Sequence, residues 1–270
     1  MMRGRQIVAL GCLFLSLSAQ EITFGPLEFK EDRVFRYRVH DFIADFARTN
    51  FYLFSKESLL VGFFIAPFYG LARKVDDRVH SSIYDSYEHR NLFDIGSCVK
   101  PFVEDIGLAI PIIGLSAGLL LSKNPNNKVT ASLLLGGLAS IGIAKSALKA
   151  VSVDCEIGNR PYCSFFKKKR VHNGFPSGHA ATATYLTLLF AFRKGIKWAV
   201  PIGVYSGLIM GLMVGCNYHY LSQVVAGIGL GIIYALAANK VAESRLKENW
   251  EINFSLTRKG APRFSAEYSF

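Results

Sequence analysis

Two histidines and their neighbours are the residues of this chain best suited to chemistry. Ser177, Gly178 and His179 stand immediately before an apolar run, and His219 and Gln223 follow forty positions later. Ser177 can cap a helix, and Gly178 lets a ligand approach the free N–H groups at a helix start, which attract phosphate. One imidazole can attack phosphorus while the other protonates the leaving oxygen. The pattern therefore predicts phosphoryl chemistry without a metal.

Further residues around this pair are candidates for orienting it and for holding phosphate. Gln223 lies one helical turn after His219, so the two share a face and we expect the amide to touch the ring. Lys149 and Arg160 precede the motif, and their cationic groups suit a phosphoryl transition state. The candidate substrate-binding residues are therefore Lys149, Arg160, Ser177 and Gly178. Four other histidines lack such neighbours and receive no role: His40, His80, His89 and His172.

Apolar helices must position these residues. The chain is 51% hydrophobic with a mean hydropathy of +0.26, which lies between soluble and integral-membrane proteins. Apolar runs near or slightly below the spanning length of about 20 residues cover residues 106–121, 131–151, 180–192, 198–216 and 221–238. The run 59–72 is shorter, which favours a buried, interfacial or re-entrant segment over a full span. We predict an all-α bundle of about five to six mostly transmembrane helices.

The ends of the chain carry different patterns. Residues 1–19 have the basic, apolar and small-residue regions of a secretory signal peptide, with lipoprotein cleavage before Cys12 as the alternative. We expect an N-terminal amphipathic or helical segment over 20–104, the bundle over 105–242 and a tail over 243–270. Alternating residues in that tail predict a β-hairpin. In an oxidising compartment Cys155 and Cys163 can form a disulfide, and Cys98 and Cys216 read as small buried residues.

Charge placement predicts an orientation in the membrane. The loops 123–128 and 193–197 are short and basic, as cytoplasmic loops tend to be. The histidines would then face the periplasm or the exterior, in a multi-pass protein of a bacterial cell membrane. Four cations at 167–170 run against this bias, either because they bind phosphate or because they form a solvated run. The net charge of +11 fits an anionic membrane surface or substrate, and no nucleic-acid module is evident.

The chain resembles the type 2 phosphatidic acid phosphatase superfamily over roughly residues 106–241. That family has a helical-bundle core and three ordered motifs: lysine, six residues and Arg-Pro; Pro-Ser-Gly-His; and Ser-Arg, five residues, His, three residues and Asp. By this resemblance His219 corresponds to the nucleophile that forms a phosphohistidine, and His179 to the acid. Arg160, Lys149, Ser177 and Gly178 would hold the phosphate, and no cofactor is implied.

Three positions depart from the family pattern. Ten residues instead of six separate Lys149 from Arg160, so Val153 occupies the strict lysine position. Met213 stands where the third motif has its arginine, and Gln223 where it has its aspartate. A carboxylate fixes the ring tautomer and stabilises the charged imidazole, and the comparable Asp to Asn change in a serine-protease triad costs about ten-thousand-fold.

Two functions remain open from the sequence. The first is a metal-independent phosphatase acting on a lipid phosphate or pyrophosphate at a membrane, through a phosphohistidine intermediate. The second is a catalytically inactive phospholipid-binding or structural membrane protein that retains the fold, which the changes at Met213 and Gln223 favour. Sparse intramembrane charge argues against a transporter. The sequence does not indicate the oligomeric state.

Overall fold

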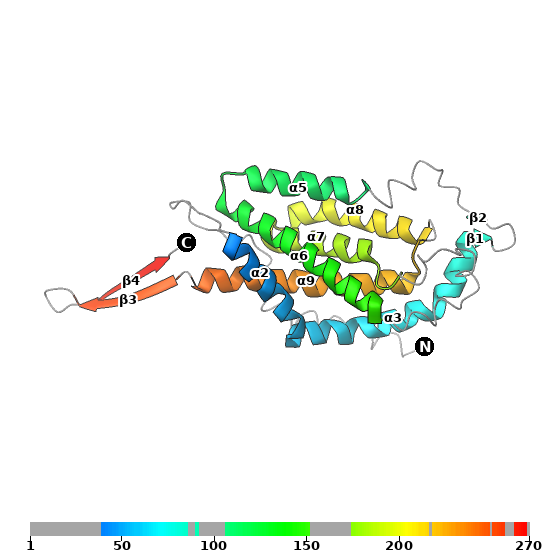
Figure 1. The fold of residues 1–270 in the computed structure, drawn as a ribbon, viewed down its shortest axis with the longest axis horizontal. Helices are drawn as coiled ribbons and strands as arrows, with labels where there is room; N and C mark the ends of the chain where they lie inside the picture. The colour runs from blue at the N-terminus through cyan, green and yellow to red at the C-terminus, as the bar shows by residue number, and fades with distance from the viewer. Residues whose placement is uncertain are drawn as a thin grey trace, which may run out of the picture.

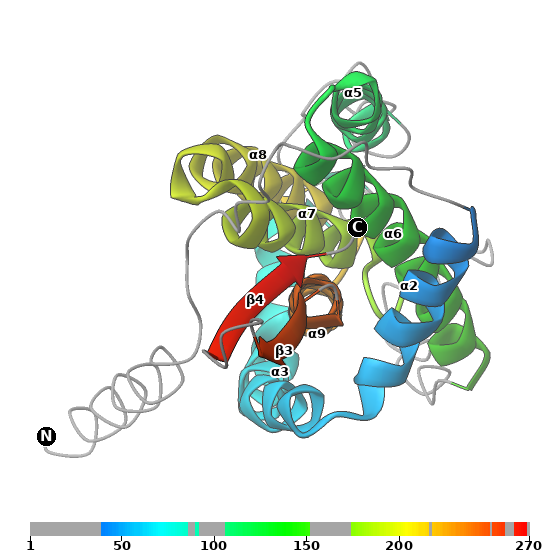
Figure 2. The same cartoon turned by 90° about the vertical axis from the view of Figure 1, so that its left-hand side faces the viewer.

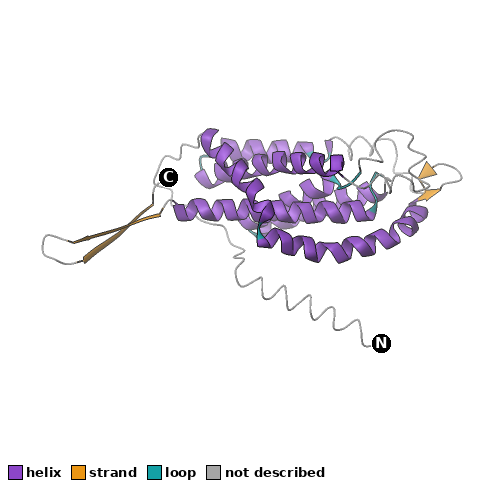
Figure 3. Cartoon of the chain, turned by 60° about the horizontal axis from the view of Figure 1, so that its bottom comes forward, coloured by secondary structure: helices purple, strands orange, loops and turns teal. Residues whose placement is uncertain are grey.

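Helices make up most of the chain that the structure describes (Figure 3). The structure is a computed structural model, and it describes residues 39–85, 90–91, 106–151, 174–215, 218–248, 250–256 and 262–268. Its helices are α2 (Val39–Phe51), a short 3-10 turn (Tyr52–Phe54), α3 (Lys56–Ile83), α5 (Ala109–Leu121), α6 (Pro125–Val151), α7 (Gly178–Lys194), α8 (Ile196–Gly215) and α9 (Leu221–Glu248). The all-helical bundle predicted from the sequence is confirmed, with seven α-helices in the described part of the chain.

Helix α7 lies in the middle of the bundle, and local residues fix both of its ends. Ser177 caps its start by accepting a hydrogen bond from the N–H of Ala180 at 3.3 Å. Gly195 ends it with a φ of 84°, a conformation that glycine adopts without steric cost, and donates its N–H to the carbonyl of Ala191. Between these ends Tyr185 is fully buried and donates to the carbonyl of Leu133 on α6 at 2.5 Å.

Helices α7 and α9 pack closely through two glycines. A Cβ at Gly231 would lie 2.5 Å from the carbonyl oxygen of Ala181, and one at Gly227 would lie 2.4 Å from that of Ser177. Small residues four apart on one helix let two backbones approach in this way. Figure 2, which looks along the bundle, shows α9 with α3, α2, α6 and α7 around it. The starts of α7 and α9 are thereby brought together.

Helix α3 corrects the prediction made for residues 59–72. The apolar run is the middle of a 28-residue helix, because charged residues such as Lys56 and Asp76 continue the helix on either side of it. The helix is long and apolar enough to cross a membrane, so the shorter reading was wrong on length. It contains Pro67, which removes a backbone hydrogen bond and accounts for a curved helix. Figure 1 shows this curve along the edge of the bundle.

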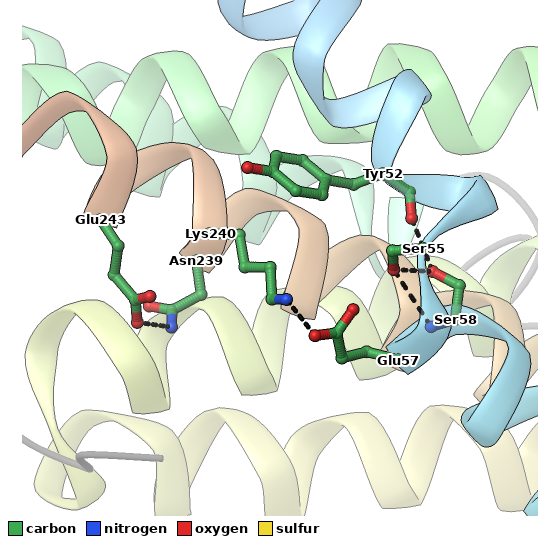
Figure 4. A network of polar contacts seen from close by, with 7 residues as sticks. All are labelled: Tyr52, Ser55, Glu57, Ser58, Asn239, Lys240 and Glu243. Atoms are coloured by element: carbon green, nitrogen blue, oxygen red, sulfur yellow. Dashed lines mark hydrogen bonds and ion pairs between the residues drawn. The ribbon is translucent and has the colours of Figure 1, made fainter. Parts of the chain in front are cut away.

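Polar contacts attach α3 to α9 near both of its ends. Near its start, Lys240 of α9 donates to Glu57 (Figure 4). Near its end, Asp76 accepts from the backbone N–H of Ser222 at 3.0 Å and from its hydroxyl at 2.6 Å. The two helices therefore run antiparallel. At a rise of 1.5 Å per residue the two attachments are about 28 Å apart along α3.

Four of the described helices are long and apolar enough to span a membrane: Lys56–Ile83, Asn126–Leu148, Ile196–Gly215 and Leu221–Ser244. The chain is accordingly a multi-pass membrane protein. Two of the predicted runs form helices that are not among the four. Helix α5 has 13 residues, and α7 has 17, of which ten are buried. Helix α7 is thus surrounded by protein rather than by lipid.

Short strands complete the described chain. Strand β1 (Tyr84–Asp85) pairs antiparallel with β2 (Arg90–Asn91), and β3 (Trp250–Leu256) pairs antiparallel with β4 (Pro262–Tyr268). Figure 1 shows β3 and β4 beyond the end of α9. The turn that would join them, residues 257–261, lies outside the described residues, so the C-terminal hairpin stays a prediction. The signal peptide at 1–19 and the Cys155–Cys163 pair also lie outside the described residues.

Candidate active site

The turn before α7 is tied to the start of α9. The N–H of Ser177 donates to the carbonyl oxygen of Gln223 at 3.0 Å, and Ser177 is fully buried. Gly178 then opens α7, so its N–H and that of His179 belong to the first turn, where backbone donors lack helical partners. Ser177 and Gly178 therefore stand where a phosphate group would meet the positive end of the helix.

The rings of His179 and His219 lie near one another, tilted, at the two helix starts. Their ring centroids are 6.5 Å apart, with an angle of 56° between the ring planes. The two predicted histidines are thus brought together at the starts of α7 and α9.

Gln223 contacts His219 as predicted, and a backbone N–H fixes the orientation of its amide. The amide oxygen Oε1 accepts the N–H of Tyr220 at 3.2 Å and lies 3.1 Å from Nδ1 of His219. Because a backbone N–H only donates, the atom facing it is the oxygen, and Nδ1 must then carry a proton to complete the contact. The other ring nitrogen, Nε2, keeps its lone pair. Gly174 makes room for this amide, since a Cβ there would lie 2.6 Å from it.

Met213 does not contribute a polar group to the site. It is 1% exposed and belongs to the packed interior, where an arginine would need a paired charge. Its carbonyl oxygen accepts the N–H groups of Tyr218 and His219 at 2.9 and 3.1 Å. The residue in the arginine position therefore closes the turn that leads into α9 instead of binding phosphate.

Lys145 is the cation that lies beside the phosphate-type turn. A Cβ added to Gly178 would lie 2.7 Å from Cδ of Lys145 and 3.1 Å from its Nζ. Lys149 is one turn further along α6, and its side chain lies outside the described part, as do Arg160 and the cations at 167–170. Sequence spacing had singled out Lys149. The spacing of four residues along the same helix is the signal that could have pointed to Lys145 as well.

Asp76 and His80 of α3 are close to the site, although we assigned neither a role from the sequence. Asp76 is 1% exposed, and its carboxylate holds Ser222 in the first turn of α9. The ring of His80 lies edge-on to that of Tyr220 with 6.5 Å between centroids. A small cavity of about 10 Å³ has Asp76, His80, His219 and Tyr220 in its lining. His80 therefore lies beside His219 and stays without an assigned role.

The spacing of Asp76 and His80, four residues apart, placed both on one face of α3, but it could not show which helix they met. Among the described residues, no group of three His, Cys, Asp or Glu side chains is placed to hold a metal ion. The polar groups near the two histidines are instead donors and acceptors: the Gln223 amide, the Asp76 carboxylate, the Lys145 ammonium and the backbone N–H groups that open α7.

Comparison with known proteins gives one match. The family model of the PAP2 superfamily matches residues 131–247. This part of the chain belongs to the PAP2 superfamily. Members of the superfamily are phosphatases that act on lipid phosphates. No curated protein and no solved structure matches the chain. The match includes both histidines and Gln223 but not α3, so Asp76 and His80 come from a helix outside the recognised domain.

Proposed function

We propose that the protein is a metal-independent phosphatase that hydrolyses a lipid phosphate or pyrophosphate at a membrane surface. The observation that carries the proposal is the approach of His179 and His219, whose ring centroids are 6.5 Å apart at the starts of α7 and α9. Family membership supports phosphatase chemistry, and the four apolar helices support a substrate that lies in a bilayer.

In the proposed first step, Nε2 of His219 attacks phosphorus and the bond to the leaving oxygen breaks. His179 gives its proton to that oxygen, so a phosphohistidine and an alcohol (or a phosphate) form. In the second step water attacks the phosphohistidine, with His179 taking its proton, and the N–P bond breaks to release inorganic phosphate. Gln223 keeps the proton on Nδ1 of His219, so the attacking lone pair stays on Nε2.

Phosphate binding is assigned to Ser177, Gly178 and Lys145, with Lys149 and Arg160 as further cations. The N–H groups in the first turn of α7 bind two of the phosphoryl oxygens in this scheme, and the Lys145 ammonium, next to Gly178, supplies positive charge that Met213 cannot. Asp76 acts through Ser222 and is a positioning residue for the start of α9.

The alternative is a phospholipid-binding or structural protein that retained the fold without turnover. Two observations favour it: Met213 is buried and brings no charge to the phosphate, and the Gln223 amide cannot stabilise a charged imidazole as a carboxylate does. This alternative predicts binding of lipid phosphate by the wild-type protein with no release of inorganic phosphate.

The deciding experiment measures phosphate release by the purified full-length protein in detergent, with EDTA present, from a panel of lipid phosphates and pyrophosphates. His219→Ala is the catalytic control. Turnover by the wild type that the variant lacks supports the proposal. No release from folded wild-type protein, together with retained lipid binding, supports the alternative instead.

Gln223→Glu sharpens the mechanism because it changes the charge while keeping the shape of the side chain. A carboxylate 3.1 Å from Nδ1 would stabilise the charged ring that forms during proton transfer. We expect kcat to rise by about tenfold or more, well short of the full effect of a triad carboxylate. Gln223→Leu, which removes the acceptor, should lower kcat. A kcat that is the same in all three proteins would contradict the orienting role of residue 223.

We also propose that the basic end of the bundle faces the cytoplasm and the histidines face the periplasm or exterior. If α3 spans the membrane, Lys56 then lies on the cytoplasmic side with the loops 123–128 and 193–197. Removal of a signal peptide at 1–19 would instead put the residues that follow it on the periplasmic or exterior side. This orientation, with α3 spanning the membrane, and removal of the signal peptide therefore exclude one another. Labelling of a cysteine introduced at Ser55 in intact cells separates them.

A further inference from the structure

A hollow in the bundle surface runs beside α3, between that helix, α6 and α9. Its volume is about 270 Å³, and its walls include Ile65 of α3, Leu148 of α6 and Ile233 of α9. Tyr69 is the one polar side chain among the residues that line it. Helices α3 and α6 carry exposed large apolar side chains, and all three helices include candidate spans, so the hollow would face the hydrocarbon of a bilayer.

One end of this groove is the phosphate-type turn itself. Phe175 and Pro176 line the groove, and the next residue is Ser177, which caps α7. The ring of Tyr69 lies edge-on to that of Phe175 with 5.8 Å between centroids. From Tyr69 the groove extends back along α3 to Val61, about 12 Å at 1.5 Å per residue. It therefore leads from the candidate active site toward the middle of the membrane.

Small residues on α3 and α9 create the groove next to a close helix contact. A Cβ at Gly229 would lie 3.0 Å from Cγ2 of Ile65, so the two helices touch at that level. Beside this contact Gly62, Ala66 and Ala226 line the hollow. A Cβ at Gly62 would meet no atom within 4 Å. The groove is thus open at Gly62 and could be narrowed there without moving a neighbour.

We propose that this groove binds one hydrocarbon chain of the substrate while its phosphate lies between the histidines. The inference rests on the proposed function and makes the groove the part of the protein that favours long-chain lipid phosphates. A chain already in lipid gains little from a second apolar surface. The groove would therefore act by orienting the headgroup against Nε2 of His219, where misplacement by about 1 Å can cost a hundredfold in rate.

The test fills the groove and compares two substrates. Gly62→Leu should lower kcat/KM for dioleoyl phosphatidic acid in detergent micelles by about tenfold or more, because a displaced chain misaligns the phosphate. The same variant should change the hydrolysis of p-nitrophenyl phosphate, which has no chain, by less than about twofold, since its phosphate needs no such guide. Ala66→Leu, from the same wall, is a second blocking variant in case Gly62→Leu does not fold.

Gly70→Leu is the matched control. Gly70 is on the same helix, a Cβ there also meets no atom within 4 Å, and the residue does not line the groove. Its activity on both substrates should equal that of the wild type. Equal losses on both substrates, or no loss on the lipid, would overturn the groove proposal while leaving the phosphatase intact. A wild-type protein that hydrolyses neither of these substrates nor any lipid phosphate or pyrophosphate of the panel would instead refute the proposed function.

Discussion

Helices α7 and α3 flank the same helix, α9, but they are held to it by different forces. Helix α7 buries ten of its 17 residues, nearly all apolar, and α3 buries four of its 28: Ser58, Ala72, Asp76 and His80. Three of those four are polar. Close packing therefore fixes α7, and a few hydrogen bonds and ion pairs fix α3.

The α7 contact with α9 builds the fold, and the α3 contact with α9 completes the candidate site. Helix α7 carries Ser177 and His179, and its place against α9 comes from Gly227 and Gly231, all within the recognised domain. Helix α3 lies outside that domain, and its contribution near the histidines is the Asp76 carboxylate. Damage to the α7 contact should unfold the bundle, and damage to the α3 contact should chiefly alter the site.

The largest expected effect comes from separating α7 and α9. Gly231→Leu places a side chain where even a Cβ would lie 2.5 Å from the carbonyl oxygen of Ala181. We expect a loss of about 3 kcal/mol or more of unfolding free energy, because backbone has to move. Thermal unfolding in detergent measures it. Gly207→Leu is the control, since a Cβ there meets no atom within 4 Å; equal melting temperatures for the two variants would contradict the packing argument.

A smaller effect is expected from releasing the end of α3. Asp76→Ala leaves the N–H and hydroxyl of Ser222 without their buried acceptor, which costs about 1–3 kcal/mol. We also expect kcat to fall more than KM changes, since the start of α9 carries His219. Asp77→Ala, at the exposed neighbouring position, should leave both quantities unchanged. A lower melting temperature with unchanged kcat would limit Asp76 to a structural role.

The smallest expected effect lies at the far end of α7. Burial of the ammonium, and secondly repulsion from Arg193, lowers the pKa of Lys194 to about 8 from its usual value of 10.5. Between these two values the unfolded chain binds more protons, so stability rises as the pH increases from about 8 to 10.5. Lys194→Met should remove this dependence, by about 1 kcal/mol at most because solvent screens the half-exposed group. Melting curves from pH 7 to 10 test it, and parallel pH profiles would refute it.

The sequence predicted α7 well because its signals are local. The apolar run 180–192, the cap at Ser177 and Gly195 lie next to one another, and the helix extends over Gly178–Lys194. The contact between His219 and Gln223 was predictable for the same reason. For α3 the charged residues at both ends of the run 59–72 concealed the length of the helix, although charged residues continue a helix without difficulty.

The remaining site contacts are long-range and had no sequence signal. Asp76 and Ser222 are 146 positions apart, and the local sequence around either residue does not indicate the contact. We chose Lys149 over Lys145 because we counted the spacing to Arg160 along the chain. The position of the Lys145 side chain depends instead on how α6 packs against Gly178. Met213 stands where the resemblance places an arginine, but its burial in the interior could only be seen once the helices were packed.

The two attachments of α3 to α9 are about as far apart as the hydrocarbon core of a bilayer is thick, some 30 Å. Glu57 with Lys240 and Asp76 with Ser222 would then mark the two boundaries of that core. His219, three residues before Ser222, would then lie at the depth of the lipid headgroups. Drawing a lipid into water would cost about 0.8 kcal/mol for each methylene exposed. A phosphate that already lies at the level of the histidines needs no such extraction from its own leaflet.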